Sequence, residues 1–355
     1  MIEPHHPPKL LAKYNFSTLS NELASASFEL GRLDGLQRSL PNPQILISPL
    51  LIKEATISSR IEGTRSTISD VLKYEATGEI KHPDTVEVSN YKKAMVMAIE
   101  QLKNTPIDLS FIKGLHQILL ENTRGHKTRG NFRKEQVWIG KEGEPIEKAT
   151  YIPLEALLIQ DYMENLEEYL LGDGEHPLIK VGILHYQFEA IHPFQDGNGR
   201  IGRLLIPLYL FWKKLLFQPT LYISGYFDKR RDRYIDALNQ VDKTGEYERW
   251  LKFFLISVKN QAKETQNLIS KINTLMKEVE NLTGHLKSPY TYKIVNFMFR
   301  MPIFKVRDVS KSSKIEERTI RRLLTKFSEL DVVKIVRFKN RRIYIFEKLI
   351  KLLSY

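Results

Sequence analysis

Residues 177–216 constrain the fold more than any other segment of this 355-residue chain. Two apolar runs with helical spacing, PLIKVGILHYQFEAI and IGRLLIPLYLFWKKLL, are interrupted only by HPFQDGNGR. A polar, glycine-rich break between two buried helices is costly unless the loop lies in a cleft, where rigid elements often present ligand-binding residues. The segment therefore predicts a helical core with a functional loop.

The loop residues suit the binding of phosphate groups. Gly197, Asn198 and Gly199 tolerate unusual backbone angles and precede a helix whose first amide groups have no internal partner. Free amides and the helix dipole favour a phosphate. Arg200 and Arg203 stand three residues apart, on roughly one side of that helix, and guanidinium groups match phosphate oxygens in geometry and charge.

Two further loop residues carry chemistry. Asp196 is the kind of single carboxylate that holds Mg²⁺ together with substrate phosphates. His192 lies four residues earlier, and an ordinary histidine pKa lets it accept a proton from an attacking hydroxyl group. Phe194, between them, is expected to anchor the loop in the core. Each residue alone has an ordinary structural explanation, but their order and spacing together favour a functional site.

The segment HPFQDGNGRIGR resembles the signature of the Fic (filamentation induced by cAMP) family, His-x-Phe-x-Asp/Glu-Gly-Asn-Gly-Arg-x-x-Arg, and matches it at every specified position. The resemblance implies a protein adenylyltransferase, which moves AMP from ATP to a Ser, Thr or Tyr hydroxyl of a target protein and releases pyrophosphate. His192 would be its catalytic base and Asp196 its Mg²⁺ ligand. The unbroken Gly-Asn-Gly favours AMP transfer over the phosphate transfer of another branch. The implied ATP-binding residues are Glu62, Gly197, Asn198, Gly199, Arg200, Ile201, Gly202, Arg203 and Arg230.

Flanking segments extend this resemblance. SSRIEG at 58–63 resembles the family's inhibitory pattern Ser/Thr-x-x-x-Glu-Gly/Asn, which implies that Glu62 pairs with Arg203 and silences the site. Residues 130–151, with VWIG followed by a glycine-rich turn, predict a β-hairpin and resemble the family's flap, on which the target protein docks by strand addition.

The adenosine pocket is less well defined in the sequence. Arg230 stands where relatives often carry Asn, so this contact departs from the family's pattern. Tyr226 and Tyr234 are more readily explained as core aromatics than as contacts to adenosine.

Helical spacing predicts the remaining elements. Residues 45–74, with a break near Gly63, precede predicted helices at 86–103, 108–121 and 153–170. Further helices run from about 230 to 282, and the last looks like a long, amphipathic linker helix. The first forty residues, punctuated by Pro and Gly, predict loops and short helices.

Residues 285–355 differ from the rest in charge. They hold 18 Lys and Arg against 6 Asp and Glu, which accounts for the whole formal charge of +12. Three helices and then the strands KIVRF and RIYIF around a basic turn follow the order of a winged helix-turn-helix. This segment is either a DNA-binding surface or a docking domain with a solvated charged face.

Composition excludes some chemistry. The chain has no Cys, so disulfides, thiolate nucleophiles and Cys-ligated zinc are excluded. No apolar run approaches the roughly 20 residues that cross a bilayer, and the N-terminus lacks the order of a signal peptide. We therefore expect a cytoplasmic protein that makes no membrane contact.

These inferences predict a mainly α-helical protein in three parts. They are an N-terminal helical region with an inhibitory helix (1–105), a Fic core with a hairpin flap and linker helix (106–284), and a winged helix-turn-helix (285–355). Two other functions stay open: a DNA-binding transcriptional regulator with a silenced Fic core, and an enzyme that removes AMP. The target protein, its acceptor residue and the oligomeric state, a homodimer included, are also left open.

Overall fold

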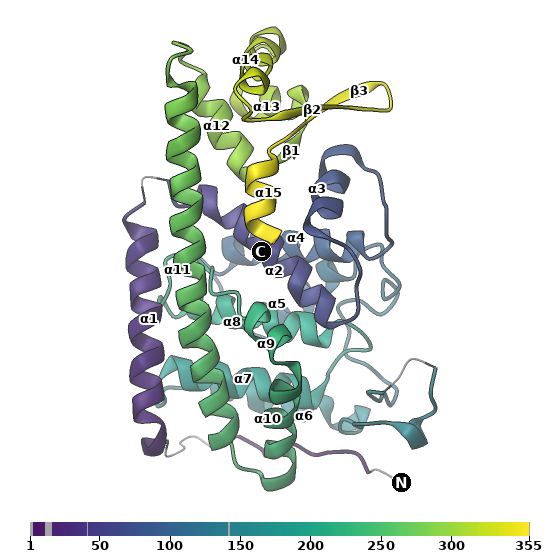
Figure 1. Ribbon diagram of the computed structural model, residues 1–355. Helices are drawn as coiled ribbons and strands as arrows, with labels where there is room; N and C mark the ends of the chain where they lie inside the picture. Colours follow the sequence, from purple (N-terminus) through teal and green to yellow (C-terminus); the bar gives the residue numbers. More distant parts are fainter. Residues whose placement is uncertain (1–2, 11–15, 41, 141–142, 355) are drawn as a thin grey trace.

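The computed structural model describes residues 3–10, 16–40, 42–140 and 143–354. Within these ranges the protein is mainly helical, with a small antiparallel sheet near the C-terminus (Figure 1). A continuous apolar core connects the N-terminal, central and C-terminal helices. No helix in the described ranges has both the length and the apolar composition that a membrane span requires.

The helices before residue 172 largely follow the predicted spacing. They are α1 (Ser20–Arg38), α2 (Gln44–Ile61), α3 (Ile68–Thr77), α4 (Thr85–Gln101), α5 (Leu109–Leu119) and α6 (Ile159–Leu171), with 3₁₀ turns at Ser17–Leu19, Ile146–Lys148 and Ala156–Leu158. A capping box starts α3, because the Thr67 side chain and the Asp70 side chain each accept the other residue's amide. The helices predicted at 45–74, 86–103 and 108–121 are confirmed, as is the break at Gly63.

The expectation of loops and short helices before residue 40 is wrong for residues 20–38, which form the single helix α1. This helix packs along α11 (Glu248–Gly284) and buries Ala26 and Leu33. Gly31 and Gly35 lie on the open face, where an added Cβ would meet nothing within 4 Å. Burial of one apolar face therefore outweighs the low helix propensity of glycine.

The predicted hairpin at 130–151 has one antiparallel bridge, between Ile139 and Tyr151, and no regular strand in its described part. Ile139 N donates to the Tyr151 carbonyl at 2.8 Å. Trp138 and Ile139 are both 42 % exposed, so little apolar burial supports a longer ladder. Residues 141–142 of this segment lie outside the described residues.

The helix predicted at 153–170 begins later, at Ile159. A 3₁₀ turn, Ala156–Leu158, precedes it, and the carbonyl groups of Pro153 and Leu154 have partners elsewhere. The Pro153 carbonyl accepts from Gln136 Nε2 at 2.8 Å, and the Leu154 carbonyl accepts from Arg133 Nη2 at 2.6 Å. These long-range hydrogen bonds replace the bonds that an earlier helix start would have made.

The central helices place the loop singled out in the sequence. They are α7 (Pro177–Ile191), α8 (Asn198–Trp212), α9 (Ser224–Lys229), α10 (Arg231–Thr244) and α11. Helix α7 crosses α11 at Gly182, where an added Cβ would lie 2.7 Å from Leu251 and 3.0 Å from Phe254. Trp250 Nε1 donates to the Gly182 carbonyl at 2.8 Å. This close approach fixes α7, and with it the loop that follows.

The segment predicted as a linker helix is the second half of α11, which runs the length of the molecule beside α1 (Figure 1). Lys263 of α11 pairs with Glu29 of α1 at 3.6 Å. Ile269, Ile272 and Val279 are buried, and α11 also contacts α7 and the C-terminal helices. This helix is therefore part of the core as well as a connection.

The C-terminal segment contains the predicted three helices and two strands, together with a short strand and a final helix that were not predicted. Its elements are α12 (Thr291–Arg300), β1 (Ile303–Phe304), α13 (Val306–Ser313), α14 (Glu317–Glu329), β2 (Lys334–Phe338), β3 (Arg341–Ile345) and α15 (Glu347–Ser354). The antiparallel sheet has the order β1-β3-β2, with Val336 opposite Ile343. Helices α12 and α15 pack against α2 (Figure 1), where Ser48 Oγ donates to the Arg300 carbonyl at 2.7 Å.

Candidate active site

A short, braced loop joins α7 to α8. His192 ends α7 in the left-handed region (φ 51°), and Gly197 precedes α8 with φ 82°. The Asn198 side chain accepts from Phe194 N and donates to the Phe194 carbonyl, both at 2.8 Å. Phe194 is fully buried, as predicted, and stacks on His116 with 3.7 Å between ring centroids. These contacts hold the polar loop residues in one arrangement.

Two residues that the sequence analysis missed support this loop from outside. His116 Nδ1 accepts from Gly130 N at 2.8 Å, so Nε2 carries the proton and donates to the Asp196 carbonyl at 2.9 Å. Burial lowers the pKa of His116 to about 4, which keeps the ring neutral. Arg133 Nε donates to the His192 carbonyl at 2.9 Å. His116 belongs to no local motif, and Arg133 belongs to the predicted flap segment 130–151, so the fold brings both to the loop.

The catalytic candidate His192 is held in a defined orientation. Its Nδ1 lies 3.3 Å from the Glu189 carbonyl, which accepts the proton on that nitrogen. The lone pair of Nε2 is then available. Burial lowers the pKa of His192 to about 4, so the imidazole is neutral near pH 7. This is the protonation state that a general base requires.

Arg203 is buried at the start of α8 and pairs with residues at the end of α2. Its Nη2 donates to Glu62 Oε1 at 2.5 Å and to the Ser58 carbonyl at 3.0 Å, and its Nε donates to Ser58 Oγ at 2.9 Å. The Glu62–Arg203 contact implied by the family resemblance is therefore present. Burial alone would raise the pKa of Glu62, but the charge and hydrogen bond of Arg203 hold it below its ordinary value.

The Glu62 carboxylate also lies close to Gly199, the second residue of α8. A Cβ at Gly199 would collide with Glu62 Oε1 and lie 2.8 Å from Arg203 Nη1. Glycine is thus needed for a carboxylate to approach the helix N-terminus this closely. Unpaired amides and the helix dipole favour an anion at that place. The Glu62 carboxylate therefore lies where the start of α8 favours a negative charge.

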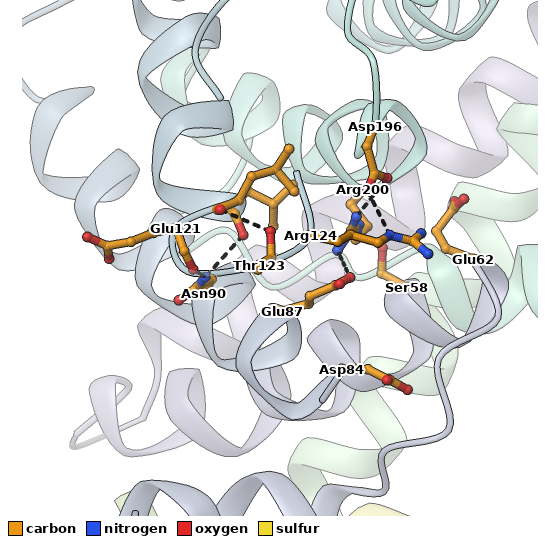
Figure 2. A network of polar contacts seen from close by, with 12 residues as sticks. Ser58, Glu62, Asp84, Glu87, Asn90, Glu121, Thr123, Arg124, Asp196 and Arg200 are labelled. Atoms are coloured by element: carbon orange, nitrogen blue, oxygen red, sulfur yellow. Dashed lines mark hydrogen bonds and ion pairs between the residues drawn. The ribbon is translucent and has the colours of Figure 1, made fainter. Parts of the chain in front are cut away.

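Arg200 and Asp196 form a second charged group beside the first (Figure 2). Arg200 is 1 % exposed; it pairs with Glu87 of α4, and its Nη2 lies 3.2 Å from Asp196 Oδ1. Asp196 Oδ2 accepts from Arg124 Nε at 3.1 Å. Burial would raise the pKa of Asp196, but these guanidinium groups hold it below its ordinary value. Neither Glu87 nor Arg124 was predicted from the sequence, since each reaches the loop from a distant segment.

The acidic and histidine side chains near this loop suit one kind of metal site. Among the described residues, no group of three or more acidic or histidine side chains gathers around a common point. The Asp196 side chain is ionised and 26 % exposed. Mg²⁺ commonly takes one protein carboxylate and completes its shell with water and substrate phosphates. Asp196 therefore fits Mg²⁺ that arrives together with a nucleotide.

Ile201 and Gly202, which were also predicted to bind ATP, direct no functional group at the loop. Ile201 is fully buried, so its side chain belongs to the core. Gly202 faces Glu189, whose Oε1 would lie 2.5 Å from an added Cβ. Glu189 Oε1 has no hydrogen-bond partner in the described part of the chain, and burial raises the pKa of Glu189 to about 7.

The predicted adenosine contacts lie among core aromatics. Arg230 stands between α9 and α10, with its guanidinium 4.0 Å from the ring centroid of Tyr226. Tyr226 and Tyr234 are both buried. The Tyr234 hydroxyl is 2.8 Å from His185 Nε2, and its ring stacks on Phe227. This agrees with the interpretation of both tyrosines as core residues.

The fold and the loop define a class of protein: a helical protein that presents a glycine-rich loop with buried arginines between two buried helices. Models of known families identify the same class. Residues 20–100 match the model described as "Fic/DOC family N-terminal", and residues 106–210 match the model described as "Fic/DOC family". Together the two matches cover more than half of the chain. The chain belongs to the Fic family.

Relatives carry the same family name. The chain is 26 % identical over 272 residues to "Protein adenylyltransferase Fic" of Culex quinquefasciatus, covering 71 % of this chain and 50 % of the relative. It is 24 % identical over 305 residues to the protein of the same name from Nematostella vectensis, covering 71 % and 66 %. The chain thus spans about half to two thirds of the length of these relatives.

Solved structures show that the fold is shared. The crystal structure of a Fic family protein from Desulfovibrio desulfuricans G20 has a TM-score of 0.62 and 21 % identity, and the match covers 96 % of this chain and 98 % of that one. Fic-1 from C. elegans has a TM-score of 0.52 and 16 % identity, covering 72 % and 74 %.

A buried carboxyl on α2 gives the stability of this region a pH dependence. Glu54 lies two helical turns before Glu62, is 2 % exposed, and accepts a hydrogen bond from Ser224 Oγ. Burial raises the pKa of Glu54 from 4.5 to about 7. Between these values the folded state binds a proton that the unfolded chain has released. The free energy of unfolding should therefore fall as the pH rises through this interval.

Replacing the carboxyl tests this assignment. In Glu54→Gln, we expect the decline in unfolding free energy between about pH 5 and about pH 8 to shrink by up to about 3 kcal/mol. Urea unfolding at each pH measures the decline. Glu278→Gln makes the same chemical change on the exposed face of α11 and should leave the decline as in the wild type. A wild-type decline in Glu54→Gln would mean that this carboxyl does not titrate in the folded protein.

Proposed function

We propose that this protein is a protein adenylyltransferase, which transfers AMP from ATP to a hydroxyl side chain of a target protein. The observation that carries the proposal is the neutral His192 beside the glycine-lined start of α8, with Arg200 and Arg203 buried next to it. This arrangement offers a proton acceptor and a polyphosphate site within one loop. The names of the relatives support the same reaction class.

The nucleotide would bind through its phosphates. The amides at the start of α8, from Gly197 to Gly199, would donate their N–H groups to the phosphates, and glycine leaves room for close approach. Arg203 would receive the terminal phosphate once Glu62 has left, because a guanidinium pairs equally well with carboxylate and phosphate. Asp196 would hold Mg²⁺, which neutralises phosphate charge when it is bound.

The reaction then needs positioning and one proton acceptor. His192 Nε2 would accept the proton of the target hydroxyl as its oxygen attacks the α-phosphorus. The bond from that phosphorus to the oxygen bridging the α- and β-phosphates breaks, and pyrophosphate leaves. The amides of α8 and the two buried arginines stabilise charge on the phosphate oxygens, which is the main contribution a protein makes to such transfers.

The target would be presented by the segment 130–151. Ile139 uses its amide and carbonyl in the bridge to residues 150–151, and the exposed Trp138 and Ile139 offer an apolar contact surface. Backbone pairing with an extended peptide positions a hydroxyl without reading much of its sequence. Arg133 connects this segment to the carbonyl of His192, so docking and catalysis share one support.

In the wild-type protein Glu62 would inhibit the reaction. Its carboxylate pairs with Arg203 and fills the anion position beside Gly199. A terminal phosphate and this carboxylate cannot occupy the same place. ATP would therefore bind in a shifted position, with its α-phosphorus out of line with the attacking hydroxyl, or would not bind.

Removal of the carboxylate should activate the enzyme. Because Arg203 becomes available to phosphate, we expect Glu62→Gly to raise autoadenylylation by at least about tenfold. Incorporation of label from ATP carrying ³²P at the α-phosphate measures this increase. Label at the γ-phosphate should not be incorporated.

Two controls test this interpretation. The double variant Glu62→Gly with His192→Ala should lose labelling, since the proton acceptor is gone. Folded Glu62→Gly protein without increased labelling would contradict the inhibitory role. Incorporation from the γ-position would contradict AMP transfer. Release of AMP from an already modified protein would instead favour the alternative activity, removal of AMP.

The C-terminal segment supports a second, separate function. We interpret α12 to β3 as a winged helix, with α14 as the helix presented to a partner and with β2, β3 and their turn as the wing. Its exposed basic side chains are Arg318, Arg321, Arg322 and Lys326 on α14, and Arg337, Lys339, Arg341 and Arg342 on the wing. Exposed basic residues on both elements favour the phosphates of a nucleic acid duplex.

Duplex binding should depend steeply on salt. We expect fluorescence anisotropy with a labelled DNA duplex to show weaker binding by the full chain as salt rises. Arg322→Gln should reduce the slope of log affinity against log salt by about 1. Lys277→Gln, an equal charge change on the exposed face of α11, should keep the wild-type slope. Identical slopes for the two variants would place any duplex binding elsewhere and favour a docking role for this domain.

A further inference from the structure

The carboxylate of Asp196 is shared by two arginines (Figure 2), one exposed and one buried. Each carboxylate oxygen faces its own guanidinium: Arg200 lies 3.2 Å from Oδ1, and Arg124 lies 3.1 Å from Oδ2. A guanidinium beside a carboxylate oxygen takes up one of its lone pairs and repels a second cation. Binding of a metal ion at Asp196 is therefore favoured when one of the two arginines moves away.

The surroundings decide which arginine moves. Arg200 is 1 % exposed and belongs to α8, and it is tied to Glu87 by a second ion pair. The Arg124 side chain is 68 % exposed. An exposed ion pair contributes only about 0–1 kcal/mol, whereas separating a buried pair costs several times more. Of these two contacts of Asp196, the one with Arg124 therefore costs less to separate.

The backbone that carries Arg124 is nevertheless fixed. Asn90, 1 % exposed on α4, donates from Nδ2 to the carbonyls of Leu119 (3.2 Å) and Glu121 (2.6 Å) at the end of α5 (Figure 2). The Thr123 hydroxyl donates to the Leu120 carbonyl at 2.9 Å. The turn thus holds the Arg124 backbone beside the loop while its long side chain is exposed to solvent.

We propose that Arg124 is a nucleotide-binding residue of the active site that occupies Asp196 until metal and nucleotide arrive, and then transfers to a phosphate. Each residue changes its binding partner. Asp196 binds the cation in place of the Arg124 guanidinium, and Arg124 binds phosphate oxygens in place of the Asp196 carboxylate. No charge is left without a partner. Mg·ATP keeps a net negative charge, and a guanidinium binds phosphate in the same forked geometry as carboxylate.

This inference rests on the proposed function, because it assumes that a nucleotide binds at α8. It adds a residue outside the family signature to that site. It also predicts opposite consequences of losing Arg124. The metal loses a competitor for Asp196, while the nucleotide loses a phosphate contact. If Arg124 only stabilised the turn, its loss would not raise the affinity for the metal ion and lower the affinity for the nucleotide.

Equilibrium binding tests the inference without catalysis. Calorimetry would use an ATP analogue with a methylene group between the α- and β-phosphates, in a Mg²⁺ series, with Glu62→Gly protein as the parent. Adding Arg124→Gln should lower the Mg²⁺ concentration for half-maximal binding by about two- to fivefold. The same change should weaken analogue binding at saturating Mg²⁺ by about tenfold.

Two companion variants sharpen the test. Lys127→Gln removes the same charge from an exposed position of the same turn and should change neither quantity. Arg124→Lys keeps the charge but loses the forked geometry, so its analogue affinity should fall between those of the parent and Arg124→Gln. If either expected shift is missing in Arg124→Gln, or if Lys127→Gln reproduces both, the inference is overturned.

A protein that does not transfer AMP would give a different result from one in which only the role of Arg124 is wrong. In that case the parent protein would bind the analogue in a Mg²⁺-dependent way but would not incorporate label from ATP carrying ³²P at the α-phosphate. The two shifts would still decide the role of Arg124. A parent that binds no analogue at any Mg²⁺ concentration would contradict both proposals.

Discussion

The buried guanidinium of Arg203, and the anion that faces it, determine the state of the whole site. A charge that is 2 % exposed needs a partner, because removing one member of a buried ion pair costs about 3–5 kcal/mol. Glu62 supplies the partner here, and a nucleotide phosphate would supply it in the proposed catalytic state. Arg203 would have an anionic partner in both states. One state can therefore replace the other without leaving a buried charge unpaired. The proposed inhibition by Glu62 would therefore be reversible without unfolding.

The scaffold explains how such an exchange can be precise. His116, Arg133 and Asn198 bind backbone groups of the loop, so its side chains are oriented before any ligand arrives. Glu62 depends on α2, whose other end is packed under α12. The Glu62 carboxylate and the C-terminal segment thus contact one helix. The side chains that would move in the proposed exchange, Glu62 and Arg124, are the more exposed members of their ion pairs.

The sequence predicted features that are encoded locally. The apolar runs of α7 and α8 and the loop between them follow from periodicity, and the pairing of Glu62 with Arg203 follows from the family resemblance. Helix α1 was missed, since burial against α11 outweighs its glycines. Glu87 and Arg124 were missed because their partners lie 113 and 72 residues away, and no local pattern marks such a pair.

A crystal structure of the Glu62→Gly protein with Mg²⁺ and a non-reactive ATP analogue would show whether a phosphate takes the place of the Glu62 carboxylate. We expect the terminal phosphate within hydrogen-bond distance of Arg203, beside Gly199, where the Glu62 carboxylate lies now, with the α-phosphorus facing Nε2 of His192. A nucleotide bound elsewhere, with Arg203 still directed only at Ser58, would contradict this expectation.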